Sequence, residues 1–92
     1  MDDAQVRDRV RALLAAGRLP GIDPVKLWAG PSTAKLCSCC GEVINTATEY
    51  ELDFNGSLTA LFHPRCYTIW NDERKRMTDE RRRDRPSQAS GG

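Results

Sequence analysis

The chain of 92 residues is long enough for one small domain, and 39% of it is hydrophobic. A core of that size is marginal on burial alone, so we expect a disulfide or a metal ion to help hold it together. The formal net charge of +1 disfavours general phosphate binding, which depends on excess positive charge. No apolar run is long enough to span a membrane or to act as a signal peptide. We therefore expect a cytoplasmic protein, whose thiols stay reduced.

Residues 1–20 are predicted to hold an amphipathic helix, from about residue 2 to residue 16. One face of this helix carries the apolar residues Val6, Val10, Leu13 and Leu14. Gly17 is suited to the C-terminal cap of the helix, and Pro20 prevents the helix from continuing.

Residues 21–35 are interrupted by proline and glycine, so we expect an ordered connector with little regular structure. Trp28, with Leu27 and Ile22, is expected to attach this connector to the core, because large aromatic side chains mostly serve burial. An exposed binding role for Trp28 is the alternative.

Residues 49–63 are predicted to form a β-hairpin, and two registers are possible. A two-residue turn at Asn55 and Gly56 would divide the apolar side chains between both faces of the hairpin. A three-residue loop, 55–57, keeps them on one face, so we predict that loop. Its expected pairs are Phe54 with Leu58, Leu52 with Ala60, and Tyr50 with Phe62.

Pro64 is suited to the first position of a helix, which we predict to run from there into the eighties. Its apolar residues are Cys66, Tyr67, Ile69, Trp70 and Met77. Beyond Asn71 almost every residue is charged, which favours a solvated extension supported by i, i+4 pairs such as Asp72 with Arg76 and Asp79 with Arg83. We expect residues 79–92 to be a charged helix end and a disordered tail, with Pro86 ending the helix.

Three cysteines and the single histidine form the pattern C-x2-C-x22-H-x2-C. Both halves have the spacing of metal ligands, and three sulfurs with one nitrogen are typical of a closed tetrahedral zinc site. We therefore predict one structural Zn²⁺ per chain, with the ligands Cys37, Cys40, His63 and Cys66. A disulfide cluster is the alternative, which a reducing compartment disfavours.

Cys39 is the remaining cysteine. A ligand pair of Cys37 and Cys39 would leave too short a loop for the usual knuckle, so we predict that Cys40 binds the metal and that Cys39 is exposed beside it. Two roles stay open for Cys39: a tolerated small residue, or a redox-responsive thiol whose oxidation ejects zinc.

The order of knuckle, hairpin and ligand-bearing helix resembles a treble-clef zinc finger. The ligand spacing is similar to that of the first zinc module of LIM domains and of the poly(ADP-ribose) polymerase fingers. The series CxxCG, YELxF, FHxxC and W, from Trp28 to about Arg74, also resembles small uncharacterised bacterial proteins. This resemblance covers about half the chain. It implies a small zinc-stabilised α+β domain over residues 36–78 and its four ligands, but no function.

Three classes of function follow for such a domain. An enzyme is disfavoured, because the one histidine is assigned to the metal and no nucleophile with its base remains. We favour a protein-interaction, adaptor or regulatory module with an unidentified protein partner. We expect no small-molecule substrate and no membrane association.

Nucleic-acid binding is the alternative function. It would use the basic residues of the C-terminal helix, joined by Arg7, Arg11 and Arg18 if the two helices lie together. The C-terminal basic residues are Arg74, Lys75, Arg76, Arg81, Arg82, Arg83 and Arg85. Five acidic residues alternate with them, and Zn²⁺ with three thiolates brings the net charge of the chain near zero, so little attraction for phosphates remains.

Overall fold

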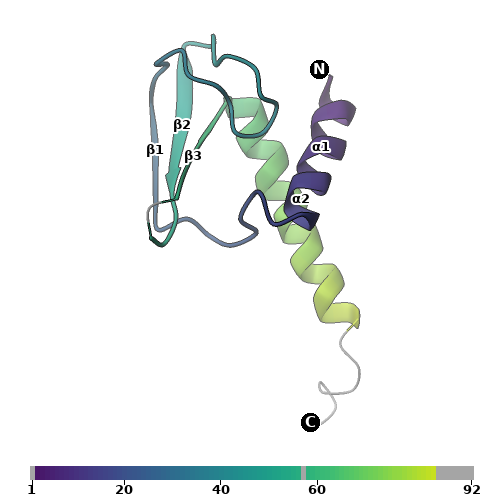
Figure 1. Cartoon of the computed structure of the whole chain (residues 1–92). Helices are drawn as coiled ribbons and strands as arrows, with labels where there is room; N and C mark the ends of the chain where they lie inside the picture. Colours follow the sequence, from purple (N-terminus) through teal and green to yellow (C-terminus); the bar gives the residue numbers. More distant parts are fainter. Residues whose placement is uncertain (1, 57, 85–92) are drawn as a thin grey trace.

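The computed structural model describes residues 2–56 and 58–84, with side chains as far as Glu80 (Figure 1). Its elements are α1 (Asp3–Ala15), β1 (Lys26–Pro31), β2 (Thr48–Asp53), β3 (Thr59–Phe62) and α2 (Pro64–Asp84). The strands form one antiparallel sheet in the order β1-β2-β3. Helix α2 packs on β2 and β3 with one side and on α1 with the other, so it lies between the sheet and α1. The fold is a small α+β domain.

Helix α1 has the boundaries and the buried face that the sequence predicts. The Asp2 side chain accepts a hydrogen bond from the backbone N–H of Gln5, and the Gln5 side chain accepts one from the backbone N–H of Asp2. This capping box satisfies two free backbone donors at the helix start. Gly17 follows the helix with a φ of +73°, a conformation that glycine adopts without strain. The buried residues of α1 are Val6, Val10 and Leu14.

The hairpin β2–β3 has the predicted register. Tyr50 pairs with Phe62 and Leu52 with Ala60. The backbone N–H of Phe54 donates to the Leu58 carbonyl oxygen over 3.0 Å, as a loop at residues 55–57 requires. The apolar face of the hairpin therefore points toward α2, and register follows the buried face.

Residues 21–35 contain the strand β1, so the expectation of little regular structure there is wrong. β1 pairs along its whole length with β2, from Lys26 opposite Asp53 to Pro31 opposite Thr48. The proline that suggested a break stands at the end of a strand at the sheet edge, where its missing N–H costs no hydrogen bond within the sheet.

The expectation that Trp28 attaches this segment to the core is also wrong. Trp28 is 47% exposed, and Leu27 and Ile22 are similarly exposed. Helix α2 contacts β2 and β3 but not β1, so side chains on either face of this edge strand have no helix to cover them. Trp28 stands opposite Glu51, which in turn pairs with Leu61, so it belongs to the face of the sheet that points away from α2.

The core lies between the hairpin and the first turns of α2. The centroid of the Trp70 ring lies 6.0 Å from that of Phe54 and 5.5 Å from that of Phe62. Its indole N–H donates to the Pro20 carbonyl oxygen over 2.9 Å, which holds the segment after α1 against α2. A buried aromatic side chain with its polar group satisfied stabilises the packing of both layers.

The charged half of α2 is helical as predicted, and the Asp72–Arg76 ion pair forms at 3.3 Å. The interpretation of this half as a solvated extension is wrong for Glu73, which is 2% exposed. The predicted Asp79–Arg83 pair, the helix end at Pro86 and the tail lie outside the described side chains and residues.

Candidate metal centre

Residues 36–43 form a tight turn that carries the first two candidate ligands. Leu36 and Val43 form an antiparallel bridge, and inside it the Cys37 N–H donates to the Glu42 carbonyl oxygen over 2.8 Å. Gly41 has a φ of +78° and its N–H donates to the Cys37 carbonyl oxygen over 3.0 Å. Only glycine adopts this φ at little cost, so the residue after Cys40 allows the chain to reverse direction there.

The second pair of candidate ligands lies at the start of α2. His63 precedes the helix, and its carbonyl oxygen accepts the first helical hydrogen bond, from the Tyr67 N–H over 2.9 Å. Pro64 occupies the first helical position, where its missing N–H costs nothing. Cys66 is in the first turn and is fully buried. Residues three apart at a helix start face the same side, so both donors point toward the turn at residues 36–43.

The structure brings all four predicted ligands together. Their donor atoms lie within 4.8 Å of one another, the three cysteines are buried and the histidine is half-buried. These residues are Cys37, Cys40, His63 and Cys66. The intervening hairpin accounts for the approach, because β3 ends at Phe62, next to the histidine.

The imidazole of His63 is oriented for metal binding. Its Nδ1 lies 3.5 Å from the Cys40 Sγ and 3.8 Å from the Cys66 Sγ, whereas its Nε2 lies 3.1 Å from the Val43 carbonyl oxygen. A carbonyl oxygen only accepts, so Nε2–H donates to it, and Nδ1 is the ring nitrogen that faces the sulfurs. Metal-binding histidines are usually oriented by such a hydrogen bond at the second ring nitrogen.

The cluster could hold a tetrahedral metal ion. Bonds of about 2.3 Å to sulfur and about 2.0–2.1 Å to nitrogen at tetrahedral angles place N and S roughly 3.5 Å apart. The distances of 3.5 and 3.8 Å from the His63 Nδ1 to two sulfurs are close to this value. A donor set of three sulfurs and one nitrogen suits zinc best among the common divalent ions.

Without a cation the thiols cannot all ionise together. Hydrogen bonds from Cys39 and then Cys66 lower the pKa of Cys37. The hydrogen bond that Cys66 shares with Cys37 raises the pKa of Cys66, and burial raises the pKa of Cys40. The cluster therefore favours one thiolate, and a divalent ion must displace further protons to bind. Metal affinity should fall as the pH falls.

Cys39 is fully buried, so the expectation that it is exposed is wrong. Helix α1 lies beside this turn, and the Arg9 Nε donates to the Cys39 carbonyl oxygen over 2.7 Å. The Cys39 thiol shares hydrogen bonds with the Cys37 and Cys66 thiols, and the bond to Cys37 raises the pKa of Cys39 to about 12. In the sequence pattern, Arg9 lies outside the apolar face of the predicted helix. Its position in the sequence gives no sign that it contacts the turn at residues 36–43.

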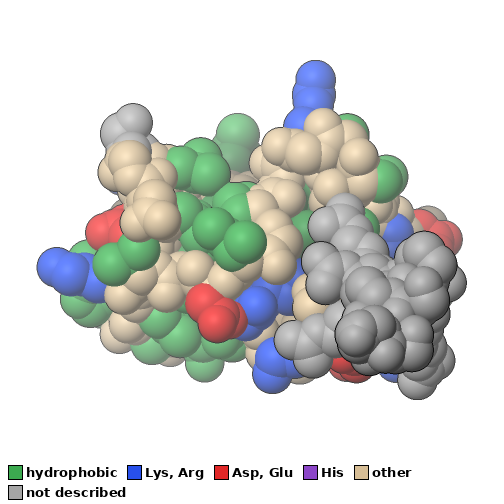
Figure 2. All heavy atoms as spheres, turned by 90° about the horizontal axis from the view of Figure 1, so that it is seen from below, with side chains coloured by type: hydrophobic (Ala, Val, Ile, Leu, Met, Phe, Trp, Pro, Cys, Tyr) green, Lys and Arg blue, Asp and Glu red, His purple; other side chains and the backbone are tan. Residues whose placement is uncertain are grey.

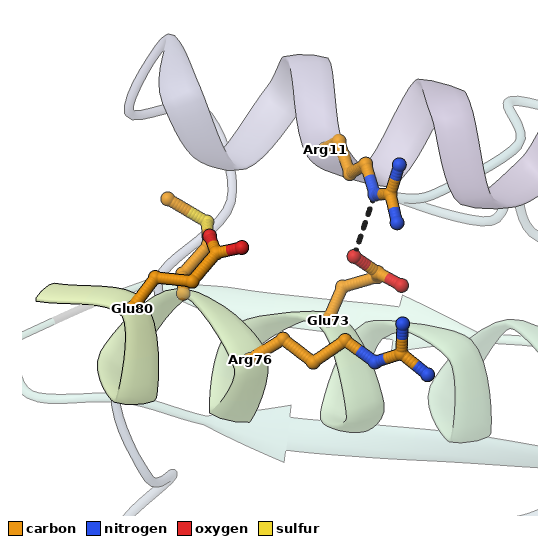
Figure 3. Close-up of a pocket in the computed structure, with 5 residues that line it drawn as sticks. Arg11, Glu73, Arg76 and Glu80 are labelled. Carbon is orange, nitrogen blue, oxygen red and sulfur yellow. Dashed lines mark hydrogen bonds and ion pairs between the residues drawn. The ribbon is translucent and has the colours of Figure 1, made fainter. Parts of the chain in front are cut away.

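Another polar contact, which joins α1 to the buried Glu73 of α2, was not predicted from the sequence. Glu73 accepts hydrogen bonds from the Arg11 Nε, over 2.7 Å, and from the Arg7 Nη1, which also donates to Asp72 over 2.7 Å. Figure 3 shows Glu73 pointing from α2 toward Arg11 on α1. An adjacent cavity of about 340 Å³ is lined by Arg11, Glu73, Arg76, Met77 and Glu80. Because these acids pair with them, Arg7 and Arg11 do not add free positive charge to α2.

Comparison of the chain with protein-family models, with curated proteins and with solved structures gave no match. The fold and the cluster are therefore interpreted from the geometry of this chain. Within residues 2–56 and 58–84, no helix is both long and apolar enough to cross a membrane.

Proposed function

We propose that the chain is a non-enzymatic structural zinc module of the treble-clef type. The observation that carries this proposal is the approach of four donor atoms, from residues far apart in sequence, to within 4.8 Å of one another. The order of turn, hairpin and helix supports the treble-clef assignment. Four protein ligands leave no open coordination position for water or substrate, so the metal acts by holding the fold together.

We further propose that the module binds a protein partner. Exposed large apolar side chains occur in the segment before β1 and on both faces of β1, and exposed apolar surface of this kind can mark an interaction site. These are Ile22, Val25, Leu27 and Trp28. Figure 2, which views the molecule from the lower end of Figure 1, shows hydrophobic side chains exposed on that face.

The charge around Trp28 favours a protein partner over a nucleic acid. Glu51 stands opposite Trp28 and Asp53 stands opposite Lys26, so carboxylates lie beside the exposed ring. Carboxylates at that position repel phosphates but attract lysine or arginine side chains of a protein. The Lys26 ammonium already lies over the Trp28 ring, 5.7 Å from its centroid, which indicates that the ring accepts a cation.

Nucleic-acid binding by α2 is the second candidate. The first basic residue of its charged half, Arg74, stacks on Trp70 and pairs with Asp23 over 2.7 Å, so it is committed to the fold. Among the described side chains of this half, two further basic residues could contact phosphates, Lys75 and Arg76. Arg76 already pairs with Asp72. Paired arginines give little of the excess positive charge that phosphate binding requires.

The test is cross-linking of the zinc-loaded chain in a native lysate, with and without nuclease. Trp28→Ala should abolish the cross-linked species, whereas Leu36→Ala, which truncates another exposed apolar side chain, outside β1, should leave them unchanged. Species that survive nuclease and depend on Trp28 support a protein partner. Species that vanish with nuclease and ignore Trp28 would replace this proposal with nucleic-acid binding.

A further inference from the structure

The two edges of the sheet differ in whether another part of the chain covers them. At the β3 edge, the Ser38 N–H donates to the Leu61 carbonyl oxygen over 2.7 Å, and the Leu61 N–H donates to the Ser38 Oγ over 3.1 Å. At the β1 edge, no strand in the described part of the chain pairs with the outer side (Figure 1). β1 is therefore the edge to which a further strand can be added.

The hydrogen bonds of the hairpin determine which backbone groups β1 presents at this edge. Alternate residues of an antiparallel strand direct their N–H and C=O groups to opposite sides. The Phe54 N–H donates to the Leu58 carbonyl oxygen on the β3 side, so the backbone groups of Glu51, three residues earlier, are directed toward β1. Glu51 stands opposite Trp28, whose own N–H and C=O groups are therefore directed toward β2. The two neighbours of Trp28 in β1 direct their backbone groups outward.

Both ends of this free edge are closed, so two residues of β1, Leu27 and Ala29, each offer an outward N–H and an outward carbonyl oxygen. Before them, the Val25 N–H donates inward, to the Asp53 carbonyl oxygen over 2.7 Å. After them, Pro31 has no N–H to offer. Unpaired backbone groups of this kind are a template for pairing with another chain. The open stretch between residues 25 and 31 therefore accepts a short partner strand.

We propose that a second copy of the chain occupies this edge, an inference that rests on the proposed protein-binding role of the surface around Trp28. The two β1 strands run antiparallel across a two-fold axis at Trp28, so Leu27 of each copy pairs with Ala29 of the other and exchanges hydrogen bonds in both directions. A shift of one strand in one direction would put the Pro31 ring where the Leu27 carbonyl oxygen needs a donor. A shift in the other direction would put Ala29 opposite Val25, whose N–H is already bound. The edge is thus self-complementary in one register, as a two-fold symmetric dimer requires.

The side chains that this pairing brings together are compatible. Trp28 and Leu27 are 47% and 45% exposed in the single chain. In the dimer the two Trp28 rings become neighbours at the axis, and cross-strand aromatic pairs stabilise antiparallel sheets. Each Leu27 lies opposite the small Ala29, and each Lys26 lies opposite Gly30. Like charges therefore do not face each other across the two β1 strands, and exposed apolar surface of both copies is covered.

Sedimentation velocity of the zinc-loaded chain, at up to about 1 mM, tests the dimer, because a short strand edge gives a weak association that dilution reverses. Wild type should show a monomer–dimer equilibrium. Trp28→Lys removes the aromatic pair and puts two like charges opposite each other at the axis, so the dissociation constant should rise roughly tenfold. Leu36→Lys is the matched control: it adds the same charge at an exposed apolar residue outside β1 and should leave the constant unchanged.

Amide hydrogen exchange locates the contact within β1. The amides of Leu27 and Ala29 should become protected as the concentration rises, whereas those of Trp28 and Gly30 bond within the sheet and should be protected at every concentration. Ala29→Pro removes one outward N–H from each copy and spares the bonds between β1 and β2, so the dissociation constant should rise about tenfold. Ala29→Val, which keeps the N–H, is its control and should dimerise like wild type.

A wild-type chain that stays monomeric at about 1 mM would overturn the inference, as would a dimer that neither Trp28→Lys nor Ala29→Pro weakens. Retention of zinc and helicity identifies the variants that fold. If Ala29→Pro does not fold, Trp28→Lys decides, because the Trp28 side chain is exposed. A monomeric wild type with Trp28-dependent species still present in the lysate would contradict the dimer alone and leave the proposed protein partner standing. Lysate species of twice the chain mass would support the dimer.

Discussion

Two of the contacts that hold helix α2 to the rest of the molecule differ in chemistry. At its first turn Cys66 joins a cluster of sulfur and nitrogen donors. Two turns later Glu73 accepts hydrogen bonds from Arg7 and Arg11 of α1. The first point joins α2 to the turn at residues 36–43, and the second joins it to α1. The two points therefore hold different layers of the fold.

The two points are also expected to differ in strength. Structural zinc contributes an apparent binding free energy of about 10–16 kcal/mol in finger peptides, which exceeds the whole stability of many small domains. Hydrogen bonds to a charged group contribute about 1.5–3 kcal/mol each, and those to Glu73 come from arginines that are partly exposed. We infer that the metal decides whether the domain folds, while Glu73 decides how firmly α1 is held.

The largest effect should come from replacing a metal ligand. Cys40→Ser and Cys66→Ser each remove one of the four proposed coordination bonds, so both variants should lose stoichiometric zinc and most of their fold. Cys39→Ser is the matched control, and it should retain one zinc and its helicity. Metal analysis and circular dichroism check this. If the Cys39 variant lost zinc while the Cys40 variant kept it, the ligand set would be wrong.

A smaller effect should follow at the second point. Glu73→Gln removes the charge that Arg7 and Arg11 share, and the unfolding free energy of the zinc-loaded protein should fall by about 1.5–3 kcal/mol. Glu80→Gln is the control, because Glu80 lies on the same helix but is exposed (Figure 3). Denaturant unfolding measures both. Equal losses of unfolding free energy in the two variants would mean that the buried position of Glu73 adds no stability.

The pH dependence of this contact has a definite sign. Burial raises the pKa of Glu73, but the hydrogen bonds from Arg11 and Arg7 outweigh it, and its pKa is lowered on folding. The contribution of Glu73 to the unfolding free energy is therefore fully present above the pKa of glutamate in the unfolded chain, about 4.3. It is lost as the pH falls through the pKa of Glu73 in the folded protein. With excess zinc, the difference in unfolding free energy between wild type and Glu73→Gln should stay constant above about pH 5 and narrow below it. A gap that widened on acidification would contradict the assignment.

The sequence predicted the first point and not the second, for a physical reason. Cysteine and histidine at metal-ligand spacing have few other roles, and the alternation of Tyr50 and Leu52 fixes the hairpin that brings them together. Glu73 lies in a run of charged residues, as its solvated neighbours on α2 do. Its burial depends on Arg11, which is 62 residues away, and local periodicity carries no such information.

The strand β1 was missed for a related reason. Its six residues, KLWAGP, have no covered face, so they show none of the alternation of polar and apolar residues that marks a half-buried strand. Its place in the sheet is decided by backbone pairing with β2, from Leu27 opposite Leu52 onward. The same lack of a covering layer leaves Trp28 exposed, contrary to the usual burial of tryptophan.

Arg9 links the two parts of this contrast, because it joins α1 directly to the turn at residues 36–43. Arg9→Ala removes the hydrogen bond to the Cys39 carbonyl oxygen, so zinc transfer to a chelator should become about tenfold faster, within the range typical of groups outside the ligand set. Arg18→Ala, an exposed arginine beyond the end of α1, is the control. Stopped-flow absorbance with a zinc-sensitive dye measures both rates. Unchanged kinetics for Arg9→Ala would show that α1 does not protect the site.

The smallest effect is expected for nucleic acid. Arg81, Arg82 and Arg83 follow the acids Asp79 and Glu80, so replacing the three arginines by glutamine should change oligonucleotide affinity little. Any weak binding by wild type should disappear as the salt rises to physiological concentration. Fluorescence anisotropy with a labelled random duplex checks this. Micromolar or tighter binding at physiological salt, abolished by the triple substitution, would favour a nucleic-acid-binding finger.

Native mass spectrometry with parallel amide NMR tests whether the fold depends on one zinc ion. We predict one zinc per chain, and its removal by a strong chelator should collapse the amide dispersion of β2 and β3, because the proposed metal joins the end of β3 to the turn at residues 36–43. Restoring zinc should restore both signals. A chain that keeps the full amide dispersion of the hairpin after complete removal of the metal would show that the fold does not depend on zinc.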